Sequence, residues 1–168
     1  MLAIGQSAPE LGLFATSDEI VHLSNFVGKN VILYFYPKDC TSGCTQEGMD
    51  FAEYYKRFAS LNTVILGVSR DLLDLHKKFK LEQRFPFELL SDPNGKVCQR
   101  YGVLKEKTVY GKKKCGVERS TFLIDKNSIL RREWRDVQVL GHVKAVLQAV
   151  GEFNESGGSS GVGSSGVG

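Results

Sequence analysis

The segment over residues 31–36 (VILYFY) limits the possible folds more than any other part of the sequence. It is a continuous run of β-branched, aliphatic and aromatic residues, and Pro37 follows it directly. Because successive side chains of a strand point to opposite faces of the sheet, an unbroken apolar run indicates a strand that is buried on both faces. Such a strand belongs in the centre of a parallel or mixed sheet, so the run predicts an α/β protein.

The rest of the chain alternates strand patterns with helix patterns. Apolar and aromatic residues recur at helical spacing from Cys44 to about Ser60, and residues 63–68 form a second buried strand pattern. Further predicted elements are a helix over 71–79, a turn over 92–95, a short helix over 96–101, strands over 120–125 and 129–134, and an amphipathic helix over 140–150. This order predicts an α/β sandwich with a central mixed β-sheet flanked by helices.

The length of 168 residues fits one domain, which we assign to residues 1–153. Residues 154–168 are expected to form a flexible Gly/Ser-rich tail. From residue 156 onward only Gly, Ser and Val occur, and the pentapeptide SSGVG appears twice. Such a sequence cannot bury a core and is typical of an added linker, so we leave it out of the functional argument.

Charge and hydropathy exclude several classes of partner. The net charge is +3, with acids and bases interspersed, which is too mild to indicate nucleic acid or an anionic membrane as a partner. The basic run over residues 112–114 is interpreted as part of an exposed, mobile loop over 111–116. There is no basic segment followed by an apolar one at the start, and no apolar run approaches the roughly 20 residues that span a bilayer. We therefore expect a cytoplasmic protein.

Four cysteines, Cys40, Cys44, Cys98 and Cys115, carry the possible redox or metal chemistry. Cys98 lies in a helix-like stretch and is predicted to be a core residue. The spacing of the cysteines does not favour zinc, because Cys40 and Cys44 have no second pair to complete the site. The histidines, at positions 22, 76 and 142, are scattered and suggest neither a metal centre nor a cysteine–histidine pair.

Cys44 has the position of a reactive thiol, because it follows a buried strand and a short loop and opens a helix. Open α/β sheets place their sites at the carboxyl ends of strands. The first turn of a helix offers unpaired N–H groups and a positive dipole end, and both favour a thiolate. Lowering a cysteine pKa by about three units costs about 4 kcal/mol, whereas a helix terminus supplies at most about 2 kcal/mol. A second positive group is therefore needed.

The residues around Cys44 resemble a known family. Pro37, Thr41 and Cys44 match the Pro-x-x-x-Thr-x-x-Cys signature of peroxiredoxins, and the block YFYPKDCTSGCTQE is similar to the peroxiredoxin Q branch, also called bacterioferritin comigratory protein. Further similar segments are residues 5–9, Leu23, residues 90–92, 101–103 and 119–125, and the final helix. The resemblance covers nearly all of residues 1–150.

This resemblance implies a thioredoxin-like fold and a thiol-dependent peroxidase that reduces hydrogen peroxide and organic hydroperoxides without a cofactor. It implies that Cys44 attacks the O–O bond and becomes a sulfenic acid. It also implies that the Thr41 hydroxyl holds the peroxide, that Pro37 shields the thiolate from water, and that Arg119 supplies the second positive group. Pro37, Thr41 and Arg119 are therefore the residues expected to bind the substrate.

The residues taken alone leave simpler roles open. Thr41 can be the N-terminal cap of the helix, and Pro37 can merely end the strand. Arg119 can be a surface residue that pairs with Glu118 or another acid. Glu47 fits the first turn of a helix, where a negative charge complements the dipole, so we expect its role to be structural.

The resolving cysteine of the branch is missing from its usual places. Many peroxiredoxin Q proteins carry it five residues after the peroxidatic cysteine, where this chain has Met49, and others carry it in the next helix, but residues 71–84 contain none. We hypothesise that the enzyme works chiefly with one cysteine and an external thiol such as thioredoxin, glutaredoxin or a small thiol. Cys40 is the second choice as resolving residue, and Cys98 and Cys115 stay open.

Two other functional classes are compared with the peroxidase. A peroxide-sensing relay would use the same sulfenic acid chemistry, and turnover with a reductant would distinguish the enzyme from it. A thioredoxin-type disulfide oxidoreductase needs Cys-x-x-Cys at the junction of strand and helix. Here Thr41 takes the first cysteine's position, and Ser120 stands where such proteins have a proline.

Overall fold

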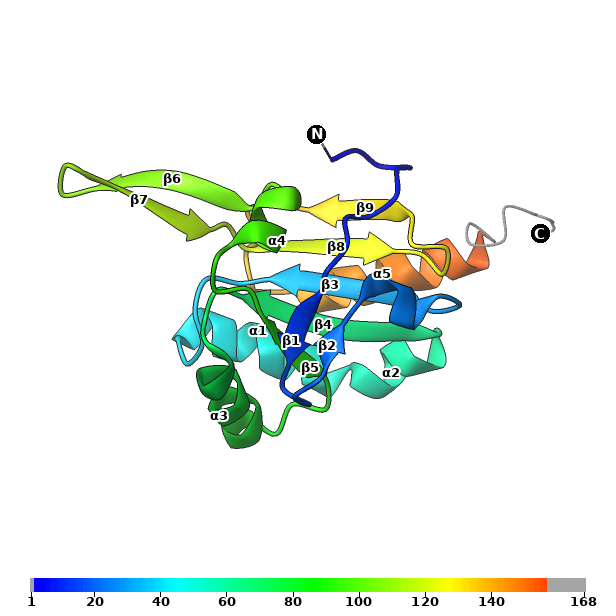
Figure 1. The fold of residues 1–168 in the computed structure, drawn as a ribbon. Helices are drawn as coiled ribbons and strands as arrows, with labels where there is room; N and C mark the ends of the chain where they lie inside the picture. Colours follow the sequence, from blue (N-terminus) through cyan, green and yellow to red (C-terminus); the bar gives the residue numbers. More distant parts are fainter. Residues whose placement is uncertain (1, 157–168) are drawn as a thin grey trace.

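The computed structural model describes residues 2–156 and contains a seven-stranded sheet in the order β2-β1-β5-β4-β3-β8-β9 (Figure 1). The strands are β1 (Leu13–Ala15), β2 (Ile20–Val21), β3 (Asn30–Phe35), β4 (Thr63–Ser69), β5 (Glu88–Ser91), β8 (Ser120–Ile124) and β9 (Leu130–Trp134). β3, β4 and β5 are parallel, while β1, β2, β8 and β9 pair in antiparallel fashion. The predicted mixed sheet is confirmed.

Helices cover both faces of this sheet. They are η1 (Leu23–Phe26), α1 (Ser42–Glu53), α2 (Tyr55–Ser60), α3 (Leu73–Gln83), α4 (Lys96–Arg100) and α5 (His142–Glu155). α1, α2, α3 and α5 pack on one face, and α4, η1 and the N-terminal segment pack on the other. Within residues 2–156, no helix has the length and apolar character needed to cross a membrane.

β3 is the centre of the core, as its sequence predicts. Val31, Leu33 and Phe35 pack into the core on the α4 side, and the alternate residues Ile32 and Tyr34 pack into the core on the α1 side. All six residues of β3 are buried. The strand therefore delivers the chain to a fixed point at its carboxyl end, where the loop before α1 begins.

Helix boundaries differ from the sequence-based prediction in several places. The helix expected from Cys44 to about Ser60 is divided at Tyr54 into α1 and α2. α5 continues to Glu155, so the first residues assigned to the flexible tail are helical. Asn154 is fixed there, because its Nδ2 donates to the Leu61 carbonyl at 2.9 Å. The tail prediction for residues 157–168 lies outside the described residues.

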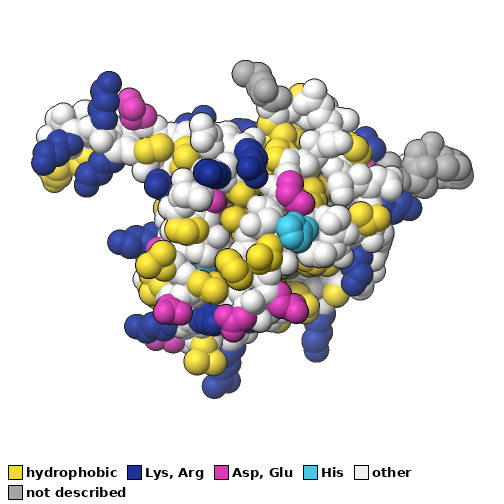
Figure 2. Space-filling view, viewed as in Figure 1, with side chains coloured by type: hydrophobic (Ala, Val, Ile, Leu, Met, Phe, Trp, Pro, Cys, Tyr) yellow, Lys and Arg dark blue, Asp and Glu magenta, His cyan; other side chains and the backbone are white. Residues whose placement is uncertain are grey.

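The loop expected over residues 111–116 is wrong, because this segment belongs to a β-hairpin that projects from the body of the molecule (Figure 1). β6 (Leu104–Val109) pairs with β7 (Lys112–Val117), and the side chains near the tip are exposed. Figure 2 shows dark-blue basic side chains on this projection. The two turn residues, Tyr110 and Gly111, have φ values of 52° and 76°, as a tight two-residue hairpin turn requires.

Candidate active site

The fold brings Arg119 against Cys44, although the two residues are 75 positions apart. Cys44 is the third residue of α1, directly after the loop that leaves β3. β8 runs antiparallel to β3 and pairs Ser120 with Phe35, so Arg119, just before β8, faces that loop. Arg119 Nη2 donates a hydrogen bond to Cys44 Sγ at 3.4 Å, and Cys44 is buried. Arg119 is therefore in the right place to be the second positive group that a Cys44 thiolate needs besides the helix terminus.

Glu47 holds the other end of the guanidinium. It lies one helical turn after Cys44, and its Oε1 accepts a hydrogen bond from Arg119 Nη1 at 2.7 Å. Its side chain is completely buried, and its Oε2 has no hydrogen-bond partner within residues 2–156. The first-turn position expected for Glu47 is wrong, because α1 begins at Ser42 and has no acidic residue in its first turn. Arg119 does pair with an acid, but the acid is the buried Glu47 and not Glu118. Spacing alone could have placed Glu47 on the same helix face as Cys44.

Burial changes the pKa values of the ionisable groups around the Cys44 sulfur. Burial raises the pKa of Glu47 to about 7, against the opposing effect of Arg119. Burial disfavours the charge of Arg119, but Glu47 and Cys44 together raise its pKa above the ordinary value. Burial and the nearby Arg119 lower the pKa of His142 to about 4, so His142 is neutral at neutral pH. The charged donor at the sulfur is thus Arg119.

The loop between β3 and α1 is anchored through Asp39, which is buried. The Tyr36 hydroxyl donates to Asp39 Oδ1 at 2.6 Å, and the Asp39 N–H donates to Asp71 Oδ2 at 2.8 Å. His76 Nδ1 lies 2.5 Å from Asp39 Oδ2, and His76 Nε2 lies 2.8 Å from the Leu90 carbonyl. Because a carbonyl oxygen only accepts, Nε2 carries a proton.

Sequence reasoning missed this anchor, because it treated the histidines as scattered. Asp39, Asp71 and His76 lie close enough to share a metal ion. Asp39 and His76 are engaged in the hydrogen bonds above, and Asp71 Oδ2 also accepts from the Ser69 hydroxyl at 2.6 Å. We interpret the cluster as the structural anchor of the active-site loop. A sequence signal existed, since an aspartate stands beside the end of a buried strand.

Thr41 and Pro37 are both exposed on this loop. Thr41 occupies the N-cap position of α1 with an extended backbone, but its side chain makes no capping hydrogen bond. Its Oγ1 donates instead to the Lys38 carbonyl at 2.8 Å, so the capping role considered for Thr41 is wrong. Pro37 lies two residues beyond the last residue of β3, which agrees with its role as a strand terminator.

The other three cysteines lie in different environments. Cys98 is buried in the core on the α4 face, as predicted, and burial together with Asp92 raises its pKa far above the ordinary value. Cys115 is exposed on β7. Cys40 is exposed on the active-site loop with a left-handed φ of 64°.

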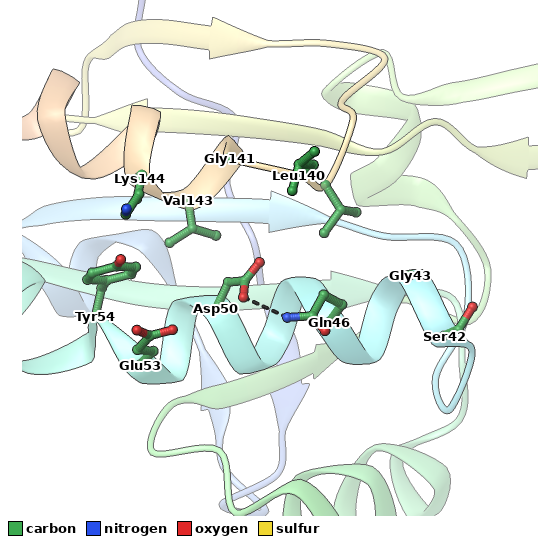
Figure 3. Close-up of a pocket in the computed structure, with 11 residues that line it drawn as sticks. Ser42, Gly43, Gln46, Asp50, Glu53, Tyr54, Leu140, Gly141, Val143 and Lys144 are labelled. Atoms are coloured by element: carbon green, nitrogen blue, oxygen red, sulfur yellow. Dashed lines mark hydrogen bonds between the residues drawn. The ribbon is translucent and has the colours of Figure 1, made fainter.

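A groove of about 490 Å³ runs beside the site, between α1 and the start of α5 (Figure 3). Its lining residues are Ser42, Gly43, Gln46, Asp50, Glu53, Tyr54, Val139, Leu140, Gly141, Val143 and Lys144. Cys44 is not among them. Gly43 lies close to both the groove and the site, because it lines the groove and a Cβ at this position would lie 3.2 Å from Arg119 Nη2.

Comparison with known proteins identifies the family. The model of the AhpC/TSA family matches residues 4–133, which include the active-site loop, Cys44 and Arg119. The chain belongs to the AhpC/TSA family. It is 47% identical to the peroxiredoxin Bcp of Bacillus subtilis over 154 residues, which cover 92% of this chain and 98% of the relative. It is 42% identical to a Bcp protein of Coxiella burnetii over 87% of this chain and 97% of that protein. Within the family it is therefore a peroxiredoxin of the Bcp/peroxiredoxin Q branch.

Solved peroxiredoxin Q structures have the same fold. A variant of Xylella fastidiosa PrxQ superposes with a TM-score of 0.86 at 36% identity, covering 92% of this chain and 98% of that one. The bacterioferritin comigratory protein of Xanthomonas campestris, studied for alkyl peroxide reduction, gives a TM-score of 0.81 at 41% identity, covering 83% and 89%. The expected thioredoxin-like fold is confirmed, and this peroxiredoxin is a thiol-dependent peroxidase.

Proposed function

We propose that Cys44 is the peroxidatic nucleophile and that Arg119 is the group that binds and polarises the peroxide. The observation that supports this most directly is the 3.4 Å contact between Arg119 Nη2 and Cys44 Sγ in a buried site. Glu47 fixes the guanidinium by a separate nitrogen, so the donor is aimed at the sulfur before substrate arrives. A preorganised donor stabilises developing charge without reorganisation at the moment of reaction.

The chemical step is a displacement on oxygen. The Cys44 thiolate attacks the nearer peroxide oxygen, an S–O bond forms, and the O–O bond breaks. The electron pair of that bond leaves with the far oxygen as hydroxide or alkoxide, which takes a proton to become water or an alcohol. Arg119 is placed to stabilise the charge on the oxygens during this transfer, and Cys44 is left as a sulfenic acid.

Thr41 and Pro37 complete the proposed substrate site. The Thr41 hydroxyl donates its hydrogen to the Lys38 carbonyl. The lone pairs of the Thr41 oxygen are therefore free to accept a hydrogen bond from the peroxide O–H. This orientation supports a role for Thr41 in holding the proton-bearing oxygen of the substrate. Pro37 has no N–H and limits the approach of water to the sulfur from its side of the loop.

The proposed substrates are hydrogen peroxide and organic hydroperoxides. The alkyl peroxide reduction studied in the Xanthomonas relative supports the second class. An external thiol, such as thioredoxin, glutaredoxin or a small thiol, returns the enzyme to its reduced form. We place the protein in the cytoplasm, where such thiols are available.

The test is peroxide consumption by the wild type, Cys44→Ser and Cys98→Ser in the presence of a thiol reductant. We expect Cys44→Ser to lose activity completely, because serine is not ionised at neutral pH. Cys98→Ser is the matched control, since Cys98 lies in the core on the other face of the sheet, and it should keep the rate of the chemical step. Substantial turnover by Cys44→Ser would refute the assignment.

A further inference from the structure

The positions of the cysteines restrict which thiol can react with an oxidised Cys44. Cys44 and Cys98 belong to the two cores on opposite faces of the sheet, so the sheet separates them. Cys115 lies within β7, which is paired with β6 over its length and projects from the body (Figure 1). A disulfide needs α-carbons within about 7 Å, and Cys40 precedes Cys44 by only four residues, on the loop that leads into α1.

We propose that Cys40 is the resolving residue: its thiol attacks the Cys44 sulfenic acid and forms an intramolecular Cys40–Cys44 disulfide after the first turn of α1 unwinds. This inference rests on the proposed function of Cys44. It replaces the one-cysteine hypothesis with the second candidate from the sequence. It also assigns the resolving role to a position upstream of the nucleophile, since Met49 stands five residues downstream.

The loop presents Cys40 at a fixed point. Its neighbour Asp39 is buried and held by Tyr36, His76 and Asp71. The Cys40 side chain itself is exposed, and its backbone is in the left-handed region, which is uncommon for a non-glycine residue. Because the Cys40 side of the pair is anchored, the movement that brings the sulfurs together must come from Cys44.

The first turn of α1 is the part of the helix that can move. Thr41 gives it no side-chain cap, Gly43 lowers its intrinsic helix stability, and its first backbone bond runs from Thr45 N–H to the Thr41 carbonyl. The next turn is held firmly, because Gly48 packs so closely that a Cβ there would lie 2.4 Å from the Phe85 ring. Unwinding therefore stops after Cys44 has been released.

Oxidation itself weakens the hold on Cys44. The contact between Arg119 Nη2 and the sulfur is charge-assisted while the sulfur is a thiolate, and such bonds are roughly twice as strong as neutral ones. The sulfenic acid carries no charge, so this assistance disappears, while Glu47 keeps Arg119 in place. The oxidised first turn is thus held less tightly than the reduced one.

The resolving step is balanced without a further reactant. The Cys40 thiolate attacks the Cys44 sulfur, an S–S bond forms, and the S–O bond of the sulfenic acid breaks. Hydroxide leaves and takes a proton to become water. The two cysteines end as one disulfide, and the external thiol then reduces it by exchange.

The surroundings of Cys40 make this step slow at neutral pH. Partial desolvation, Asp39, Glu82 and Asp71 raise the pKa of Cys40, whereas Lys78 acts in the opposite direction. Below the pKa the thiolate fraction grows about tenfold for each pH unit. Disulfide formation should therefore accelerate as pH rises, and a second peroxide can compete for the sulfenic acid at lower pH.

The experiment treats the full chain with stoichiometric hydrogen peroxide and follows it by intact mass and non-reducing peptide mapping. We expect the wild type to lose two hydrogens and yield a Cys40–Cys44 linkage, at a rate that rises about tenfold per pH unit. Cys40→Ser should instead gain one oxygen and be trapped by a sulfenic acid reagent. Cys40→Gly, which adopts a positive φ without strain, repeats this test with the loop conformation preserved. Cys115→Ser is the matched control and should behave as the wild type.

Two results would overturn the inference while leaving the proposed function intact. One is a wild type that stops at the Cys44 sulfenic acid under every pH tested. The other is an intramolecular disulfide that still forms at the wild-type rate in both Cys40 variants. A Cys44 that does not react with peroxide at all would overturn the inference and the proposed function together.

Discussion

Arg119 makes its two contacts with different nitrogens, Nη1 to Glu47 and Nη2 to Cys44. A lysine ammonium is a compact charge without this planar fork, so it cannot serve both partners in the same geometry. We predict that Arg119→Ala slows the oxidation of Cys44 about a hundredfold or more, in line with the loss of one preorganised donor, and that Arg119→Lys recovers only part of the rate.

Stopped-flow kinetics of the first oxidation step test this prediction. Arg132→Ala is the matched control, because Arg132 is exposed on β9 and lies over the Trp134 ring. Its rate should equal that of the wild type. An unchanged rate in Arg119→Ala would show that the guanidinium takes no part in the reaction.

Glu47 should make stability depend on pH. Its pKa is raised from 4.5 to about 7, so the folded state favours the neutral carboxyl. The stabilisation is complete below about pH 4.5 and is lost as pH rises through about 7. The shift corresponds to a pH-dependent stabilisation of about 3 kcal/mol. The Glu47→Gln variant lacks this pH dependence, because glutamine does not ionise. Relative to this variant, the wild type should lose about that much free energy of unfolding between about pH 4 and pH 8.

Urea denaturation at several pH values measures this difference. Glu53→Gln serves as the control, because Glu53 is exposed on the same helix, and its stability should follow that of the wild type. Parallel pH profiles for the wild type and Glu47→Gln would contradict the prediction.

At the scale of elements, α1 depends on a close approach to the segment that leads into β5. A Cβ at Gly48 would lie 2.4 Å from Phe85 Cζ, well inside van der Waals contact. We predict that Gly48→Ala lowers the free energy of unfolding by about 1–3 kcal/mol, the usual cost of overpacking. Gly151→Ala in α5 is the control, since within residues 2–156 no atom outside its chain neighbours and its own helix backbone lies within 4 Å of a Cβ there, and it should raise stability by about 0.5–1 kcal/mol. Equal effects in urea denaturation would rule out a packing origin.

At the scale of the whole molecule, the β6–β7 hairpin stands outside the core. Residues 105–115 are exposed, whereas Val103 and Val117 at its base are buried. Leu104 pairs directly with Val117, so an Asn-Gly turn can join them in place of residues 105–116. We predict that this shortened chain unfolds in urea with a free energy within about 1 kcal/mol of the wild type, because the removed side chains bury little apolar surface. A loss of several kcal/mol would show that the hairpin stabilises the body.

Local residue patterns predicted the central strand, a helix that begins near Cys44 and the alternation of strands and helices. These features follow from short-range periodicity and from turn residues, which act over a few positions. The sequence also indicated that a second positive charge is needed at Cys44, because a helix terminus stabilises a thiolate too weakly on its own. The β6–β7 hairpin was not predicted, because neither of its faces is apolar and its sequence has no hydrophobic periodicity.

Which groups surround the Cys44 sulfur depends on how the strands and helices pack together. The pairing of β3 with β8 sets Arg119 beside Cys44, and helix packing buries Glu47 behind Arg119. The link from Asp39 to His76 likewise joins residues from different elements. Contacts of this kind depend on the register between strands and on which helix covers which face, and these are properties of the assembled sheet that no local pattern of residues carries.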